Sequence, residues 1–152
     1  MTNINDEIRQ YAYESSKQKA LLNLMFTHNW IIQKINDFFR DQTVTNQQFN
    51  VLRILNGQHP KPCTAKHIKE VMIFKAPDLT RLLDRLIDKK LAERRLCEGN
   101  RRSLDISITV SGIELLNRLN PELSKLMDSH IYLSESESES LSTLLDKARG
   151  PS

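Results

Sequence analysis

Paired arginines are the side chains of this sequence whose type and spacing most clearly suggest a binding chemistry. The pair Arg94-Arg95 precedes Gly99-Asn100, a dipeptide typical of turns, and the pair Arg101-Arg102 follows it. Guanidinium groups bind phosphate oxygens, and the negative potential of a narrow DNA minor groove attracts them. We therefore expect this segment to face a polyanion.

The net charge of +3 is unevenly distributed along the 152 residues. Residues 61–110 contain twelve lysines and arginines against seven acids, a local charge of +5, while the remainder carries −2. A basic segment between mildly acidic flanks suggests a module that faces a polyanion, although an ordinary solvated surface can have the same composition.

A metal site and an enzyme active site are the main alternatives for the polar residues. His59, Cys63 and His67 are spaced four apart, but Pro60 and Pro62 prevent them from sharing one helical face, and no fourth ligand is evident. We favour a loop with surface histidines and expect no metal and no cofactor. The chain has no glycine-rich phosphate loop and no nucleophile with an orienting base in a recognisable motif, so we do not expect an enzyme.

The two cysteines, Cys63 and Cys97, are too few for a disulfide framework and are expected to be free thiols. Cys97 lies between Arg95 and Arg101, which can lower the pKa of a thiol. An unreactive cysteine in a hairpin is the favoured interpretation.

The elements that position these residues are mainly helical, because four glycines and five prolines leave little material for a turn-rich sheet protein. The length suits one domain, or a compact core with appended helices, and excludes a large multidomain enzyme. Period-2 alternation predicts a hairpin of Leu91–Leu96 with Leu104–Ile108. Periodicity and capping signals predict helices over residues 6–40 and 77–89, and others that begin after Thr45, Thr64, Thr109 and Ser134.

The predicted helix over residues 6–40 has a wide apolar face and would be about 50 Å long. Such a face exceeds what a small domain can bury, so we expect it to pack against a second chain. A bundle helix within one chain is the alternative.

The predicted helix over residues 77–89 begins at Pro77, a favourable first helical residue. Its leucines lie on one face and its charged residues on the other. The order of a short helix, a turn, this helix and a hairpin predicts a winged helix-turn-helix domain, in which the second helix enters the DNA major groove. The fold class expected is mainly α with a small β-hairpin, a winged helix-turn-helix domain plus a helical dimerisation region.

Four short motifs resemble the signature of the MarR (multiple antibiotic resistance regulator) family of bacterial transcription factors. They are Leu82-Leu-Asp-Arg-Leu86, Leu91-Ala-Glu-Arg94, Asn100-Arg-Arg102 and Ile108-Thr-Val-Ser-Gly112. The resemblance covers about Thr45 to Leu116 by motif, and the helical flanks agree in layout.

This resemblance implies a homodimer that binds a near-palindromic operator in double-stranded DNA, most often as a repressor. It implies a dimerisation helix over residues 1–42, a winged helix-turn-helix domain over 43–110, and helices over 111–152 that complete the dimerisation region. Many relatives respond to a small phenolic or lipophilic effector or to thiol oxidation. The chain lacks a signal peptide and a long apolar segment, so we expect a cytoplasmic protein with no membrane association.

The resemblance also assigns roles to individual residues. Arg102 falls on the wing arginine that enters the minor groove, and Arg101 on its companion. Thr80 and Arg81 fall on the positions of the recognition helix that meet DNA. The helical face adds further candidate contacts to bases or phosphates, namely Lys75, Asp78 and Arg85.

Three residues depart from the family pattern. Asn100 replaces a wing aspartate that pairs with arginine in relatives, so that ion pair is lost. Lys90 replaces the glycine after the recognition helix, so we expect the helix to end differently. Ala76 stands where a capping serine is common, which should weaken the start of the helix. Asn100 and Ala76 motivate a rival hypothesis, a winged-helix scaffold that binds proteins and has lost operator recognition.

An effector pocket is expected where the first helix, the second helix and the helix after the wing converge. Core packing is the alternative for its apolar members. The candidate lining residues are His28, Trp30, Phe49, Arg53 and Leu116.

Overall fold

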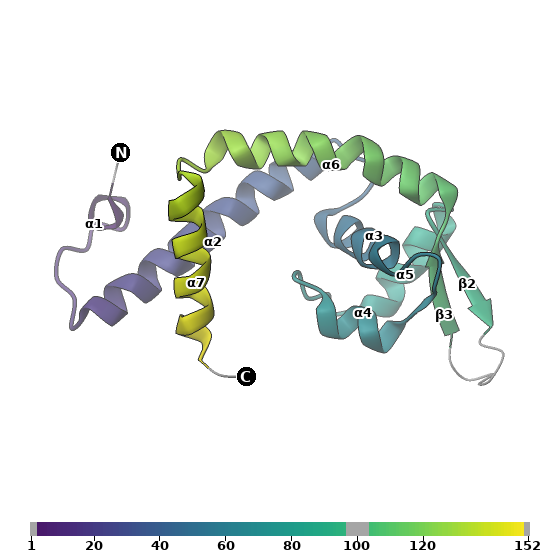
Figure 1. The fold of residues 1–152 in the computed structure, drawn as a ribbon, viewed down its shortest axis with the longest axis horizontal. Coiled ribbons are helices and arrows are strands. Elements are labelled where there is room, and N and C mark those ends of the chain that lie inside the picture. The colour runs from purple at the N-terminus through teal and green to yellow at the C-terminus, as the bar shows by residue number, and fades with distance from the viewer. Residues whose placement is uncertain (1–2, 97–103, 151–152) are drawn as a thin grey trace. The chain divides into compact units, whose positions relative to one another are not determined.

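The fold was derived from a computed structural model that describes residues 3–96 and 104–150. It is mainly helical with a small antiparallel sheet, which confirms the expected fold class (Figure 1). The elements in chain order are α1 (Ile4–Glu7), α2 (Ser16–Arg40), α3 (Asn46–Gln58), β1 (Cys63–Thr64), α4 (Ala65–Val71), α5 (Leu79–Asp88), β2 (Ala92–Leu96), β3 (Leu104–Ile108), α6 (Val110–His130) and α7 (Glu135–Arg149). They form two compact units, Met1–Ile113 and Glu114–Ser152.

Polar side chains fix the starts of several helices, as the sequence predicts. Thr45 Oγ1 accepts a hydrogen bond from the Gln48 amide at the start of α3, and the Gln48 side chain accepts one from the Thr45 amide. Thr64 caps α4 through the His67 amide. Ser134 and Glu137 form a second capping box at α7. These bonds satisfy amides that the first turn of a helix leaves open.

The N-terminal helix is shorter than expected, and the prediction of one helix over residues 6–40 is wrong. The chain leaves the helical conformation after α1, and Arg9 adopts a left-handed backbone with φ of 52°. Ser15 is extended and its side chain accepts a hydrogen bond from the Gln18 amide, which starts α2. The 25 residues of α2 span about 38 Å.

The sheet has three strands in the order β1-β3-β2. The predicted hairpin is confirmed, with Ala92 opposite Ile108 and Leu96 opposite Leu104. The additional strand β1 pairs its Cys63 with Ile106. Its two residues are too few to show an alternating pattern, so the sequence does not predict this strand.

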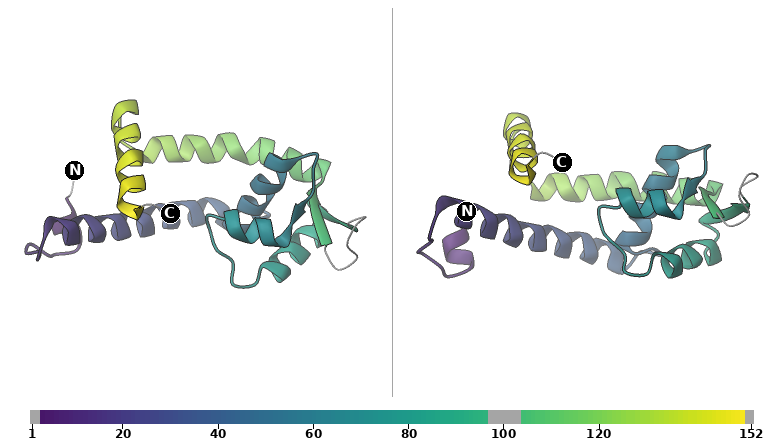
Figure 2. Two further views of the ribbon diagram at one scale, coloured as in Figure 1. Left: turned by 60° about the horizontal axis from the view of Figure 1, so that its bottom comes forward. Right: turned by 90° about the horizontal axis from the view of Figure 1, so that it is seen from below.

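The core of the first unit lies between α3, α4, α5 and the sheet, which Figure 2 shows from two directions. Its largest fully buried side chains include Leu52 and Leu55 from α3, Ile68 from α4 and Leu86 from α5. Ile106 and Ile108 of β3 are buried beside α3. This packing places α5 at the surface with only one of its faces covered.

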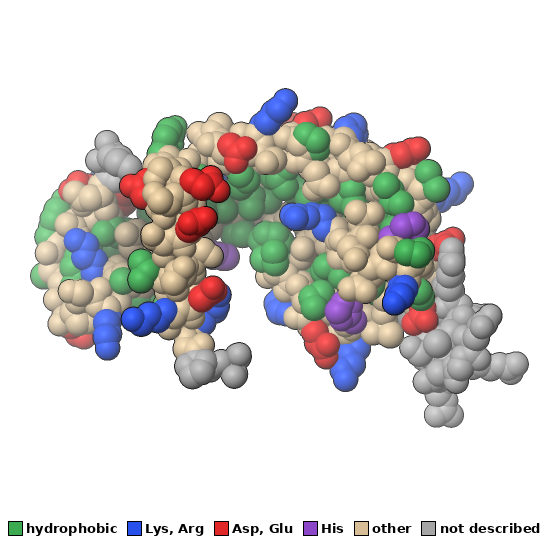
Figure 3. Space-filling model, viewed as in Figure 1, with side chains coloured by type: hydrophobic (Ala, Val, Ile, Leu, Met, Phe, Trp, Pro, Cys, Tyr) green, Lys and Arg blue, Asp and Glu red, His purple; other side chains and the backbone are tan. Residues whose placement is uncertain are grey.

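The second unit contains most of α6 and all of α7. Leu115 and Leu119 of α6 are buried, and the helix continues through Pro121. No residue of α7 is buried, and its Leu144 side chain is 61% exposed. Acidic side chains gather over this helix (Figure 3).

Candidate nucleic-acid interface

The helix α5 separates apolar and polar residues on opposite faces. Leu82, Leu83 and Leu86 are buried in the first unit, as their periodicity predicts. Arg81 and Arg85 are exposed, and their spacing of four residues places both on one face. Thr80 is also exposed. The structure therefore brings together three of the predicted contact residues on the uncovered side of the helix.

The start of α5 differs from the expectation. The helix begins at Leu79, so the prediction that Pro77 is the first helical residue is wrong. Asp78 is the N-cap, and its Oδ1 accepts a hydrogen bond from the Arg81 amide at 2.9 Å. The expected weakness at Ala76 is also wrong, because an aspartate two residues later supplies the cap. This cap orients the turn that carries Thr80 and Arg81.

The end of α5 has a left-handed geometry that favours glycine. Lys90 is left-handed with φ of 58°, and its amide donates to the Ile87 carbonyl at 2.8 Å. The Leu91 amide donates to the Leu86 carbonyl at 3.0 Å. These two bonds form a Schellman motif, so the expectation that the helix ends differently at Lys90 is wrong. The hydroxyl of Thr109 donates to the Lys90 carbonyl at 2.7 Å and supports the motif.

The turn between α4 and α5 is held by polar side chains of α3. The buried Asn50 accepts a hydrogen bond from the Ile73 amide at 3.1 Å, and Gln47 donates to the Lys75 carbonyl at 3.2 Å. The ammonium group of Lys75 donates to two carbonyls at the end of α4, those of Lys69 and Glu70. Lys75 therefore caps α4.

The hairpin adjoins α5 through an ion pair between Arg94 of β2 and Asp84 of α5. Both side chains are partly exposed, so the pair contributes little stability by itself but links the two elements. The other hairpin residues singled out from the sequence, Arg101, Arg102, Cys97 and Asn100, lie outside the described residues.

Comparison with known proteins agrees with this architecture. Residues 42–103 match the model of the MarR family. A MarR transcription factor from Planctomyces limnophilus is 29% identical, with a TM-score of 0.69, over 89% of this chain and 98% of that chain. Residues 42–103 therefore form a MarR-like domain, and the chain as a whole is similar to MarR transcription regulators. Members of the MarR family are transcription regulators rather than enzymes, which agrees with the sequence prediction.

Two further proteins similar to this chain are informative. The uncharacterized HTH-type transcriptional regulator YpoP of Bacillus subtilis (strain 168) is 29% identical over 102 residues, which are 67% of this chain and 69% of YpoP. The S. aureus MepR–DNA complex is 25% identical with a TM-score of 0.72, over 91% of this chain and 96% of that chain.

The residues predicted to line an effector pocket have different surroundings in the MarR-family fold. Phe49 is buried, with its ring 5.1 Å from that of Phe39, so it packs in the core. His28 and Arg53 are exposed and Trp30 is half-buried, while Leu116 is buried in the second unit. The pocket that they would form stays a prediction.

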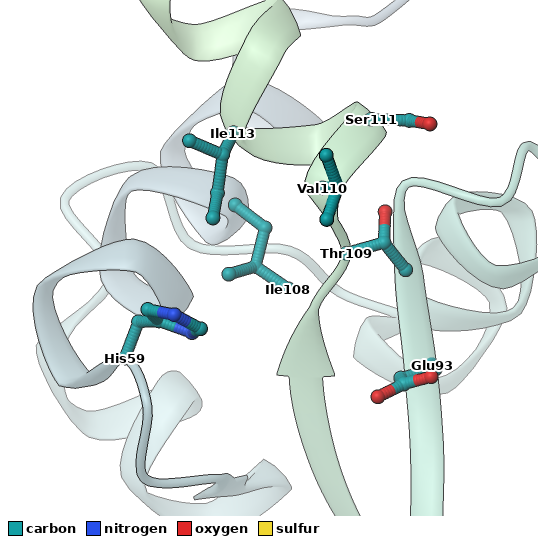
Figure 4. Close-up of a pocket in the computed structure, with 7 residues that line it drawn as sticks. All are labelled: His59, Glu93, Ile108, Thr109, Val110, Ser111 and Ile113. Carbon is teal, nitrogen blue, oxygen red and sulfur yellow. The ribbon is translucent and has the colours of Figure 1, made fainter.

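A pocket among the described residues lies elsewhere, at the base of the wing (Figure 4). His59 at the end of α3 and Glu93 of β2 stand on either side of it, and Ile108 lies between them. The remaining lining residues are Thr109, Val110, Ser111 and Ile113. None of the five predicted effector residues lines it.

Cys63 is a buried free cysteine of β1. Burial, with a smaller effect from the Asp105 carboxylate, raises the pKa of its thiol. A raised pKa reduces the thiolate fraction and with it the reactivity of this sulfur. The residues that the structure describes contain no group of three or more potential metal ligands and no helix able to span a bilayer.

Sequence reasoning missed the polar residues of α3 that hold α5. One signal was available, because Gln48 precedes Leu52 and Leu55 by four and seven residues and so shares their buried face. A polar side chain at such a position requires a hydrogen-bonding partner.

Proposed function

We propose that the chain binds double-stranded DNA sequence-specifically through α5. The observation that carries this proposal is the exposed face of Arg81 and Arg85, backed by buried leucines and capped by Asp78. A helix fits the major groove, and arginine can donate two hydrogen bonds to a guanine edge. The MepR structure, which is a complex with DNA, supports the same use of the fold.

Individual contacts follow from this placement. Thr80 and Arg81, in the first turn of α5, meet base edges, and Arg85 meets a base or a phosphate. For Arg101 and Arg102, which lie outside the described residues, the resemblance of the wing motif to the family is the basis for a proposed contact with the adjacent minor groove. Lys75 and Asp78 contribute mainly by holding the helix, since the Lys75 ammonium caps α4 and the Asp78 carboxylate caps α5.

The DNA-bound form is proposed to be a homodimer with residues 1–42 and 111–152 as its dimerisation region. Leu21 and Met25 of α2 are 57% and 55% exposed, and Leu141 and Leu144 of α7 are also exposed. Large apolar side chains on terminal helices favour association with a second copy. Two symmetry-related winged domains then require a near-palindromic operator, with half-sites about one helical turn apart.

Regulation is part of the same proposal. The dimer acts in the cytoplasm as a repressor, and a small-molecule effector changes its affinity for the operator. Transcription from the operator-bearing promoter, with and without the protein, measures the direction of regulation.

The decisive experiment selects duplexes from the source genome and titrates the bound ones at several salt concentrations. The affinity should fall steeply with salt, because phosphate contacts release counterions. Arg81→Ala should lose about 1 to 3 kcal/mol of operator binding. Arg53→Ala, an exposed arginine of α3 outside the proposed dimerisation region and the proposed DNA contacts, is the matched control and should bind as the wild type does.

A salt-insensitive or absent interaction would instead favour the protein-binding scaffold. One of the two observations that motivated this rival no longer supports it, since Asp78 caps the helix where Ala76 does not.

A further inference from the structure

The C-terminal end of α5 is tied to the segment that joins α2 to α3. The Lys89 ammonium donates one hydrogen bond to Gln48 Oε1 at 3.1 Å and another to the Thr43 carbonyl. These partners lie 41 and 46 residues earlier in the chain. Lys89 is therefore a direct link between the recognition helix and the residues that follow α2.

Gln48 is the buried half of this link, with only 3% of its surface exposed. Its Oε1 accepts hydrogen bonds both from Lys89 and from the Thr45 amide. The Gln48 side chain thus caps α3 and also accepts a hydrogen bond from the charged ammonium group of Lys89 at the end of α5. Because Gln48 is buried, it has no access to DNA.

We propose that Lys89 and Gln48 are positioning residues that set the orientation of α5 for operator recognition. Asn50 and Gln47 of α3 hold the turn before α5. Together with the bond from Lys89 to Gln48, residues of α3 therefore hold both ends of α5. The link to Thr43 also makes the orientation of α5 dependent on the segment between α2 and α3. This inference rests on the DNA-binding function proposed above.

The competing explanation for any effect of Lys89 is a phosphate contact. A phosphate contact strengthens binding to every sequence and contributes about one unit to the salt dependence. A positioning residue instead changes the preference for the operator over other DNA and leaves the salt dependence unchanged. The two roles are therefore separable by measuring both quantities.

The test uses the full chain, the duplex that the wild type selects and a scrambled duplex of equal length. Lys89→Met and Gln48→Met should each lower the ratio of operator to scrambled affinity, by roughly three- to tenfold. Gln48→Glu keeps an acceptor for the ammonium and should retain most of the ratio. The double variant should lose no more than Lys89→Met alone, because Lys89→Met already removes the bond to Gln48 together with the bond to Thr43.

Thr45→Ala is the matched control, because it removes the capping hydroxyl of α3 but keeps the bond between Lys89 and Gln48. It should reduce thermal stability to an extent similar to Gln48→Met and leave the affinity ratio unchanged. Amide chemical shifts along α5 should move in the two methionine variants and not in Thr45→Ala.

Three results would overturn the inference. Lys89→Met could weaken both duplexes equally and reduce the salt dependence, as a phosphate contact would. Thr45→Ala could lower the ratio as much as Gln48→Met, which would show an effect of stability alone. If the wild type prefers no duplex, the proposed DNA-binding function is refuted, and this inference with it, before any variant is compared.

Discussion

Replacement of Gly112 by alanine should destabilise the protein, although alanine is the better helix former. Gly112 lies in the first turn of α6, and a Cβ there would stand 2.3 Å from the Leu91 carbonyl oxygen and 2.7 Å from Ile108 Cγ1. The Leu91 carbonyl oxygen belongs to the backbone and also accepts a hydrogen bond from the Thr109 amide, so it cannot move away from the new Cβ without breaking that bond. Relief of this overlap requires β2 and α6 to separate at the base of the wing.

The magnitude follows from two opposing effects. Overpacking of a closely packed site costs about 3 kcal/mol, and the gain in helix propensity returns up to about 1 kcal/mol. The free energy of unfolding should therefore fall by about 2 kcal/mol, which lowers the melting temperature of a chain of this size by about 4 to 8 °C. Urea denaturation followed by circular dichroism, at one fixed protein concentration, measures the change.

The matched control is Gly57→Ala in α3. A Cβ at Gly57 meets no atom within 4 Å, so this variant keeps the propensity gain and should be more stable by up to about 1 kcal/mol. The two alanine substitutions thus have opposite expected signs. Equal or greater stability of Gly112→Ala would refute the argument that close backbone approach requires glycine at that position.

Three other perturbations test the ends of α5 and the buried thiol. Lys90→Gly should raise the free energy of unfolding by about 1 kcal/mol, because it relieves a left-handed lysine; an unchanged urea midpoint would contradict this. Asp78→Ala should lose about 1 kcal/mol of stability, while Asp78→Ser retains a capping oxygen and most of the stability; equal losses in urea denaturation would argue against the cap. The raised pKa of Cys63 means that the unfolded chain loses the thiol proton first as the pH rises, so stability should decline above about pH 8.5. Cys63→Ala should show a smaller decline, and identical pH profiles of the two proteins would exclude Cys63 as its cause.

Much of the fold was predictable because its signals are local. The leucine face of α5, the capping boxes at Thr45 and Ser134, and the alternation in β3 each depend on residues within a few positions of one another. The break between α1 and α2 was not predictable from glycine or proline, because none occurs there and the left-handed residue is Arg9.

The candidate site likewise has one part that the sequence predicts and another part that it does not. The exposure of Arg81 and Arg85 follows from helical periodicity alone. The bond between Lys89 and Gln48 joins residues 41 positions apart, and periodicity carries no information about such a pair. The sequence indicates the local bond of Gln48 to the Thr45 amide, and only the fold shows that Lys89 bonds to the same oxygen.

The departures from the family pattern at Ala76 and Lys90 bear on function through helix geometry. Asp78 supplies the cap that Ala76 lacks, and Lys90 adopts a left-handed backbone conformation that favours glycine. Both ends of α5 are therefore defined by hydrogen bonds, and Leu82, Leu83 and Leu86 are buried. These substitutions alter how the recognition helix is held, and they leave its arginine face available to DNA, so neither one argues for loss of operator recognition.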